Sequence, residues 1–437
     1  MRETSLCGFY VAVLLAGVLS QPLRAEEPHS PEVHKHTECV YKIGPVFTLS
    51  GAIQKALDYS PRLESAAADV EVAKGIEKQA GYLPNPEIGF EAANVVGSGD
   101  FGGADSAEFT YSLRQTVEIG GKRSARRRAA EAARGAAGTA LMAERLNIKR
   151  DVRVAYYDAL AKDEEVKLAL EQEQLAKDVL DTVSEQVQAA AEPEIQLSKA
   201  EVAYATSVIA RERKEHELRV AKGKLAKLLG ASALHCSLDH AHFFELKAPS
   251  SVENYRANLA RIPDMLRFSH IKMEKESLLD LERARAIPDP NFSFGVREFR
   301  VSDDQAFVFS VSLPIPVFDQ NRGNVAKARA EVARTASNAQ QVKLILEQQL
   351  TESWEQWSTY YSEAQRLRTE LLPSAEKAFA LARIEFAKGR FSYHEVLDAQ
   401  RTLFDARSQY YDSLRRYHTA RANVERLTTV TGEEQGR

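Results

Sequence analysis

Two carboxylates near the C-terminus are the residues best placed to act on a solute in this 437-residue chain. Glu395 and Asp398 stand three residues apart in a proline-free stretch, so an α-helix presents both on one face. Gly389 precedes them and supplies the turn before that helix. Carboxylates grouped in this way can favour cations in a narrow passage. The alternative is a solvated helix face.

Histidine is concentrated in two short segments that each contain a cysteine. These residues are His29, His34, His36 and Cys39, and His235, Cys236, His240 and His242. Such tracts can bind metal ions. Their spacing is loose, however, and we assign neither a metal ligand nor a cofactor from it.

No catalytic motif is present in the sequence, which contains no glycine-rich phosphate loop, no His-Glu-x-x-His and no Gly-x-Ser-x-Gly. We therefore do not expect an enzyme. A formal net charge of −4 argues against binding to nucleic acid, which requires a basic surface. Charged residues make up 27% of the chain, too many for a bundle of membrane-spanning helices.

The N-terminus has the features of an export signal. Arg2 precedes an apolar segment at 9–19, and cleavage after Ala25 fits the small residue there. Residues 1–25 are the expected signal peptide. Removing it leaves Cys39 and Cys236 as the only cysteines, in a compartment where disulfides persist.

An internal duplication organises the rest of the chain. Residues 83–90 recur as 287–294 at an offset of 204, and residues 109–113 recur as 309–313 at an offset of 200. Each copy predicts a helix, a Pro-x-Pro, two strands and two long helices. The expected parts are an N-terminal extension (26–46), a first repeat (47–230), a connector (231–250), a second repeat (251–432) and a tail (433–437).

The strands are predicted from apolar residues that alternate with polar ones. They are expected near 86–96 and 107–118 in the first repeat, and near 290–300 and 306–317 in the second. About ten residues is the length of a tilted transmembrane strand. Four strands cannot close a barrel, but three copies of the chain supply twelve.

Long helices are predicted from composition and from heptads. No proline occurs in 87–192, 194–248, 317–372 or 374–437. The helix expected at 124–190 would span about 100 Å at 1.5 Å per residue. The return helices near 194–229 and 393–431 carry heptads, as in Val396, Leu403, Tyr410, Tyr417 and Val424. Sustained heptads indicate coiled-coil packing.

Over residues 47–432 the chain resembles the TolC-like outer-membrane factor family. The resemblance lies in the opening helix at 47–57 with Ser60-Pro61-Arg62-Leu63, in the Pro-x-Pro pairs at Pro84 and Pro288, and in the hairpin signature at 383–400. Residues 372–376 and 397–407 resemble the CzcC-like subgroup of heavy-metal efflux.

The resemblance implies a mainly α fold with a membrane β-barrel. Three chains would form a twelve-stranded barrel in the bacterial outer membrane, continued by an α-helical tunnel in the periplasm. This homotrimer would be the exit duct of a tripartite efflux system. Its partners would be a periplasmic adaptor, an inner-membrane resistance-nodulation-division pump and outer-membrane lipid. The subgroup implies export of divalent heavy-metal cations.

Other functions stay open at this point. The first alternative is a duct for drug efflux or type I protein secretion. The second, from a different class, is a periplasmic coiled-coil scaffold.

The resemblance also implies roles for individual residues. Glu395 and Asp398 would form two rings of carboxylates at the constricted periplasmic end, although some relatives carry a basic residue where Phe391 stands. The tips of the helical hairpins would dock on the adaptor. Their residues are Ala191, Pro193, Gly389, Arg390 and Ser392.

Two further expectations concern cysteine and arginine. In the resembled fold the N-terminal approach and the connector both pass around the mid-section of the tunnel, so Cys39 and Cys236 could form a disulfide. A basic cluster follows the first strand pair and would bind lipid headgroups or neighbouring acidic helices, or form ordinary ion pairs between subunits. Its members are Lys122, Arg123, Arg126, Arg127 and Arg128.

Overall fold

The structure is a computed structural model that describes residues 46–189, 193–388, 390–391 and 393–430. All of them belong to one compact unit, Tyr41–Arg437. The expected signal peptide, most of the N-terminal extension and Cys39 lie outside the described residues.

Each half of the chain contains helices, a strand pair and two more long helical segments. The first half contains β1 (Val46–Phe47), α2 (Leu49–Tyr59), α3 (Pro61–Ala80), β2 (Glu87–Ala93), η1 (Gly99–Phe101), β3 (Glu108–Thr116), α4 (Lys122–Gln188) and α5 (Glu194–Leu228). The second contains β4 (Ser237–Leu238), α6 (Val252–Arg256), η2 (Leu259–Arg261), α7 (Pro263–Arg285), β5 (Asn291–Phe299), β6 (Asp304–Ser312), α8 (Arg322–Arg366), η3 (Leu367–Leu371), α9 (Leu372–Ala387) and α10 (Tyr393–Thr428). Among the described helices, none combines the length and apolarity needed to cross a membrane.

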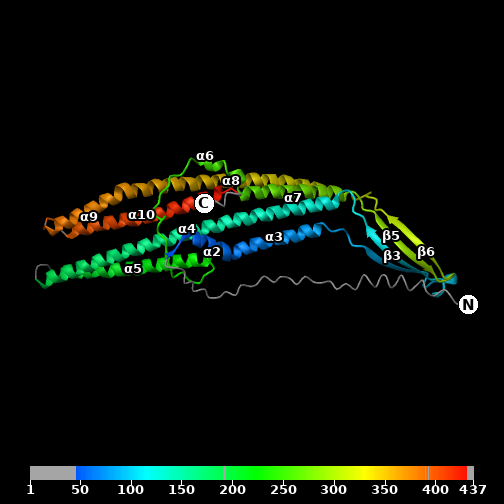
Figure 1. The fold of residues 1–437 in the computed structure, drawn as a ribbon, viewed down its shortest axis with the longest axis horizontal. Coiled ribbons are helices and arrows are strands. Elements are labelled where there is room, and N and C mark those ends of the chain that lie inside the picture. Colours follow the sequence, from blue (N-terminus) through cyan, green and yellow to red (C-terminus); the bar gives the residue numbers. More distant parts are fainter. Residues whose placement is uncertain (1–45, 190–192, 389, 392, 431–437) are drawn as a thin grey trace. The chain divides into compact units, whose positions relative to one another are not determined.

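Helix α4 is the element to which most of the other helices are attached. Its 67 residues are rich in alanine and long charged side chains and contain no proline, so nothing in the sequence interrupts it. Gly120 and Gly121, both with positive φ, make the turn that leads into it. Helices α2, α3, α5, α7 and α10 all pack against it (Figure 1).

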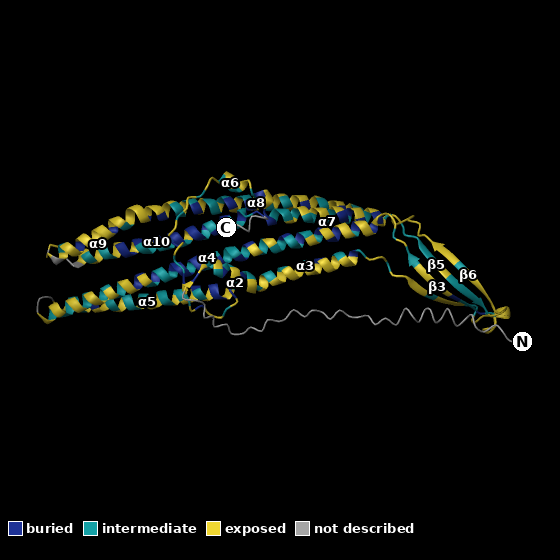
Figure 2. Ribbon diagram, viewed as in Figure 1, coloured by how far each residue is buried: buried dark blue, intermediate teal, exposed yellow. Residues whose placement is uncertain are grey.

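The heptad positions of α10 are buried. Leu403, Tyr410, Tyr417 and Val424 are each at most 6% exposed, because they face α4, α8 and α9. The equivalent seam of α5 is only partly covered, since Leu225 is buried but Tyr204 and Leu218 are not (Figure 2).

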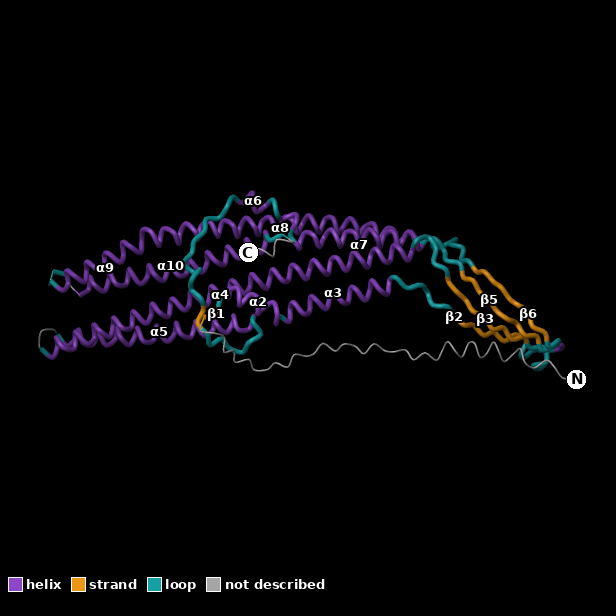
Figure 3. The backbone as a smooth tube through the Cα atoms, in the orientation of Figure 1, coloured by secondary structure: helices purple, strands orange, loops and turns teal. Residues whose placement is uncertain are grey.

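The four long strands form one antiparallel sheet in the order β2-β3-β5-β6 (Figure 3). The central pairing of β3 with β5 joins the two repeats, with Tyr111 opposite Val296. β6 ends at Ser312, so the prediction that Leu313, Ile315 and Val317 continue the strand was wrong. Pro314 and Pro316 alternate with these residues and cannot donate ladder hydrogen bonds, which explains the earlier end.

The main apolar core surrounds the middle of α4. Val152, Tyr156 and Leu160 are at most 1% exposed and pack with residues of α2, α5 and the connector. The Tyr156 hydroxyl donates to the Phe47 carbonyl at 2.7 Å and accepts from the Asp239 amide at 3.0 Å. It thereby ties the parallel pair β1–β4 to the helix.

A second core lies between α8 and α10. It contains Leu350, Trp357 and Tyr417, and Trp357 is only 5% exposed. Beyond this core, η3 is a π-helical turn at 367–371, followed at once by α9 with Pro373 in its first turn. Proline lacks an N–H and disturbs the regular ladder, which is a common cause of such a turn.

Candidate functional site

The acidic pair lies in the first turns of α10. Glu395 and Asp398 are both exposed, and Glu395 is in the first turn, where the helix dipole favours a negative charge. The Thr402 hydroxyl binds the main-chain carbonyl of Asp398 at 3.0 Å, so this contact leaves its carboxylate open to solvent. Because residues three apart in an α-helix share a face, α10 agrees with the expectation that Glu395 and Asp398 lie on one face. Its role at a pore stays a prediction.

At the tip between α9 and α10, the basic residues Lys388 and Arg390 both pair with the carboxylate of Glu385. Lys388 Nζ lies 2.7 Å from Glu385 and the Arg390 guanidinium lies 3.1 Å from it, while the Arg390 amide donates to the Glu385 carbonyl at 2.9 Å. These two cations hold the pKa of Glu385 below its usual value. Gly389 and Ser392 lie outside the described residues.

At the other hairpin tip, the return helix α5 begins at Glu194, one residue after Pro193. Pro193 has φ −70° and ψ 147°, and its carbonyl accepts from the Gln196 amide at 3.0 Å, so it caps α5. Ala191 is outside the part of the chain that the structure describes. Docking of either tip on an adaptor stays a prediction.

Arg407 connects helices of both repeats behind the acidic pair. Its guanidinium lies 2.8 Å from Glu171 of α4 and 3.4 Å from Glu376 of α9. Both carboxylates are more than half exposed, so these ion pairs add little to stability.

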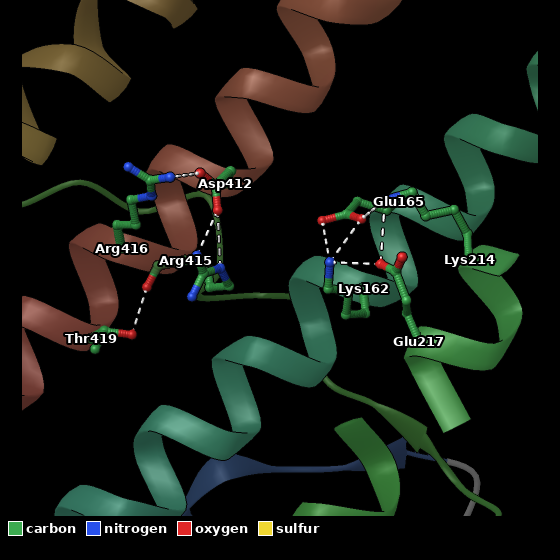
Figure 4. A network of polar contacts seen from close by, with 8 residues as sticks. All are labelled: Lys162, Glu165, Lys214, Glu217, Asp412, Arg415, Arg416 and Thr419. Carbon is green, nitrogen blue, oxygen red and sulfur yellow. Dashed lines mark hydrogen bonds and ion pairs between the residues drawn. The ribbon is translucent and has the colours of Figure 1, made fainter. Parts of the chain in front are cut away.

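A four-membered charge network joins α4 to α5 (Figure 4). Lys162 donates to Glu165 at 3.0 Å and to Glu217 at 2.9 Å, and Lys214 donates to Glu165 at 2.6 Å. Sequence reasoning missed this network. The i,i+3 pairs Lys162–Glu165 and Lys214–Glu217 were the available signal.

Figure 4 also shows a second network, which lies on α10. There Asp412 holds Arg415 and Arg416, each at 2.7 Å. Both pairs have the i,i+3 or i,i+4 spacing of one helical turn and therefore support α10 itself.

Four of the five residues of the basic cluster have polar partners within the chain. Lys122 is buried against Asp289 at 2.7 Å, Arg126 pairs with Glu118 at 2.7 Å, and Arg128 lies 3.4 Å from Asp280. These three residues have carboxylate partners on the same chain, and ion pairs between subunits stay a prediction. Arg123 donates to the Gly81 carbonyl at 2.6 Å.

Cys236 is half-buried and makes no disulfide among the described residues. Burial raises the pKa of its thiol. Because Cys39 lies outside those residues, the Cys39–Cys236 bridge stays a prediction. Counting free thiols on the denatured, unreduced chain tests it, and two free thiols would exclude it.

The connector histidines have different surroundings. His242 is largely exposed and lies 3.2 Å from Glu245. His240 contacts Asp163 and Glu164 of α4.

Comparison with known proteins identifies the class. The sequence profile of the outer membrane efflux protein family matches residues 52–231 and 254–430, one segment in each repeat. The chain therefore belongs to this family. It is an outer-membrane efflux channel of the TolC-like type, and it is not an enzyme.

Two relatives share much of its length. The cobalt-zinc-cadmium resistance protein CzcC of Cupriavidus metallidurans is 29% identical, over 88% of this chain and 90% of the relative. The nickel and cobalt resistance protein CnrC of the same organism is 27% identical, over 67% of this chain and 69% of the relative.

A solved structure supports the fold. A crystal structure of CusC superposes with a TM-score of 0.73 at 18% identity, covering 90% of this chain and 96% of the other. The predicted fold class, long coiled helices with two strand pairs, is confirmed by this likeness.

Proposed function

We propose that this channel exports divalent heavy-metal cations. It would work as a homotrimer with a periplasmic adaptor and an inner-membrane resistance-nodulation-division pump. The channel performs no chemistry, and the pump supplies the energy.

The observation that carries the proposal is the pair of exposed carboxylates beside the α9–α10 tip, Glu395 and Asp398. In a threefold assembly each becomes a ring of three negative charges. A ring of one sign in a narrow passage lowers the energy of cations relative to anions. The relatives named for cobalt, zinc, cadmium and nickel resistance support the same class of substrate.

The sheet supports the threefold assembly. Its outer strands β2 and β6 each leave one edge without a neighbour among the described strands. A lipid-facing sheet cannot leave such edges open, and three four-stranded sheets joined edge to edge give a closed set of twelve.

A deletion strain tests the substrate. We expect loss of the gene to sensitise the host to zinc, cobalt, cadmium or nickel more than to dyes and antibiotics, with the wild-type gene restoring tolerance. Sensitivity to drugs alone would instead favour the drug-efflux alternative. A defect confined to one secreted protein would favour type I secretion.

A further inference from the structure

His240 of the connector lies against two consecutive carboxylates of α4. Its Nε2 is 3.1 Å from Asp163 Oδ2 and its Nδ1 is 2.9 Å from Glu164 Oε1. All three side chains are at most 26% exposed. One ligand atom from each residue falls within 4.8 Å of the other two.

The contacts of His240 with Asp163 and Glu164 are those of an ion pair and raise the pKa of His240 to about 9, so a bound cation would replace a ring proton. Nδ1 is a buried ring nitrogen without a hydrogen-bond partner, although Glu164 Oε1 is only 2.9 Å away. The oxygen therefore lies beside the axis of the ring nitrogen rather than along it. Two ligand atoms at about 2.1 Å from one cation are roughly 3.0 Å apart in octahedral geometry and about 3.4 Å apart in tetrahedral geometry. Nδ1 and Oε1 are spaced like adjacent ligands.

A cationic side chain already reaches the same oxygens. Lys167 Nζ lies 2.8 Å from Glu164 Oε1 and 3.2 Å from Asp163 Oδ2. Its side chain is 52% exposed and extends from the surface of α4, so it can move into solvent. The place between the carboxylates thus accepts positive charge and can be vacated.

We propose that Asp163, Glu164 and His240 bind a divalent transition cation of the zinc, cobalt or nickel class. The imidazole Nδ1 and Glu164 are the first ligands, and Asp163 accepts from the opposite ring N–H or coordinates directly. Water completes the shell. A donor set of one imidazole nitrogen with carboxylate oxygens suits these ions better than calcium or magnesium, which prefer oxygen alone.

A carboxylate on the far ring nitrogen also orients metal-bound histidines in many proteins. The site lies on the connector rather than at the hairpin tip. It does not rest on the proposed substrate, because a duct for any solute could carry it. A bound cation would fasten the connector to α4.

Binding is measured on the full-length protein, purified in detergent with a tag that contains no histidine. Equilibrium dialysis with Zn²⁺ and the visible absorption of added Co²⁺ provide two readouts. We expect saturable binding of one cation per chain at this site. His240→Gln should weaken this binding at least tenfold, and so should Asp163→Asn combined with Glu164→Gln.

Two further variants make the result specific. His242→Gln is the matched control, because it removes an exposed histidine of the same connector and should leave binding unchanged. Lys167→Gln removes the competing ammonium and should tighten binding severalfold even if the ligand variants fold poorly. Full binding by His240→Gln, no tightening in Lys167→Gln, or no saturable binding in the wild type would each overturn the site.

Discussion

Glu395 and Asp398 concentrate negative charge at the first turns of α10, where both side chains meet solvent. At the scale of a single residue, their effect on permeating ions follows from Coulomb interactions in a narrow passage. Replacing them by Gln and Asn keeps their size and removes only the charge.

We expect Glu395→Gln with Asp398→Asn to lower the cation-to-anion permeability ratio severalfold in planar bilayers and to weaken block by multivalent cations. The control is Asp69→Asn with Glu71→Gln, which removes the same charges from exposed positions of α3. If both pairs give the same ratio as the wild type, the two residues belong to an ordinary solvated face.

His418, in contrast to Glu395 and Asp398, is shielded from solvent. Its ring is 2% exposed, stacks on Tyr157 with centroids 3.7 Å apart, and its Nε2 donates to the Phe243 carbonyl at 2.8 Å. The pKa of His418 is lowered to about 4, mainly by burial and to a lesser extent by Arg421, against the opposing effects of the Phe243 carbonyl and Glu245. The unfolded chain takes up this proton near pH 6.5.

Neutral His418 therefore makes its full contribution to the free energy of unfolding above about pH 6.5. This contribution is lost as the pH falls toward 4. Between pH 7 and pH 5 the loss is about 2 kcal/mol. His418→Gln keeps an N–H donor but cannot take up a proton, so its denaturation midpoint should fall less over this range than that of the wild type. Parallel decreases in the two proteins would contradict the assignment.

At this scale the sequence predicted a shared face for Glu395 and Asp398, because that depends only on local helical geometry. It did not predict the partner of His240. Asp163 lies 77 positions earlier, and only the folded connector brings the two together. The charge network of Lys162 was missed because half of its partners lie on a different helix.

Among the elements, the paired strands β3 and β5 approach each other closely at Gly295. A Cβ atom added to Gly295 would lie 2.6 Å from the Tyr111 carbonyl oxygen and 3.3 Å from Ser112 Cα. Both are backbone atoms of the paired strand and cannot move aside cheaply. The close approach therefore requires glycine.

Gly295→Val should destabilise the sheet by about 1–3 kcal/mol, because overpacking displaces the backbone. Heat stability of the purified channel on unboiled gels measures this. The control is Gly75→Ala in α3, where an added Cβ meets nothing within 4 Å, so helix propensity should make it neutral or slightly stabilising. Equal stability of the Gly295 variant and the wild type would disprove the steric argument.

The sequence predicted helices and strands well where one pattern dominates over many residues. The alanine-rich, proline-free run of α4 and the alternation in β3 are such cases. The ends of helices and strands were less predictable. β6 begins at Asp304, in a stretch that looked like a loop, because its pairing with Phe299 decides the start.

At the scale of the whole molecule, the apolar side chains exposed on the four-stranded sheet need a surrounding that removes them from water. Phe307 is 94% exposed in the single chain, and Phe294 and Phe309 are 60% and 59% exposed. Aromatic side chains of this size are costly to leave in water.

We expect the purified mature protein to need detergent and to have the mass of three chains by light scattering with the detergent contribution subtracted. It should also insert into liposomes. A monodisperse monomer that stays soluble without detergent would contradict both the membrane sheet and the threefold assembly.

The π-helical turn at 367–371 has a consequence for the ancestry of the two halves. A π turn accommodates one residue more than an α turn, and one residue corresponds to about 100° around an α-helix. Helix α4 is regular over its whole length, whereas the helix formed by α8 and α9 is interrupted by this turn. A residue of α9 therefore points about 100° away from where an uninterrupted continuation of α8 would place it. Segments taken from α4 would not face the same way in α9, so the two halves are no longer interchangeable across this turn.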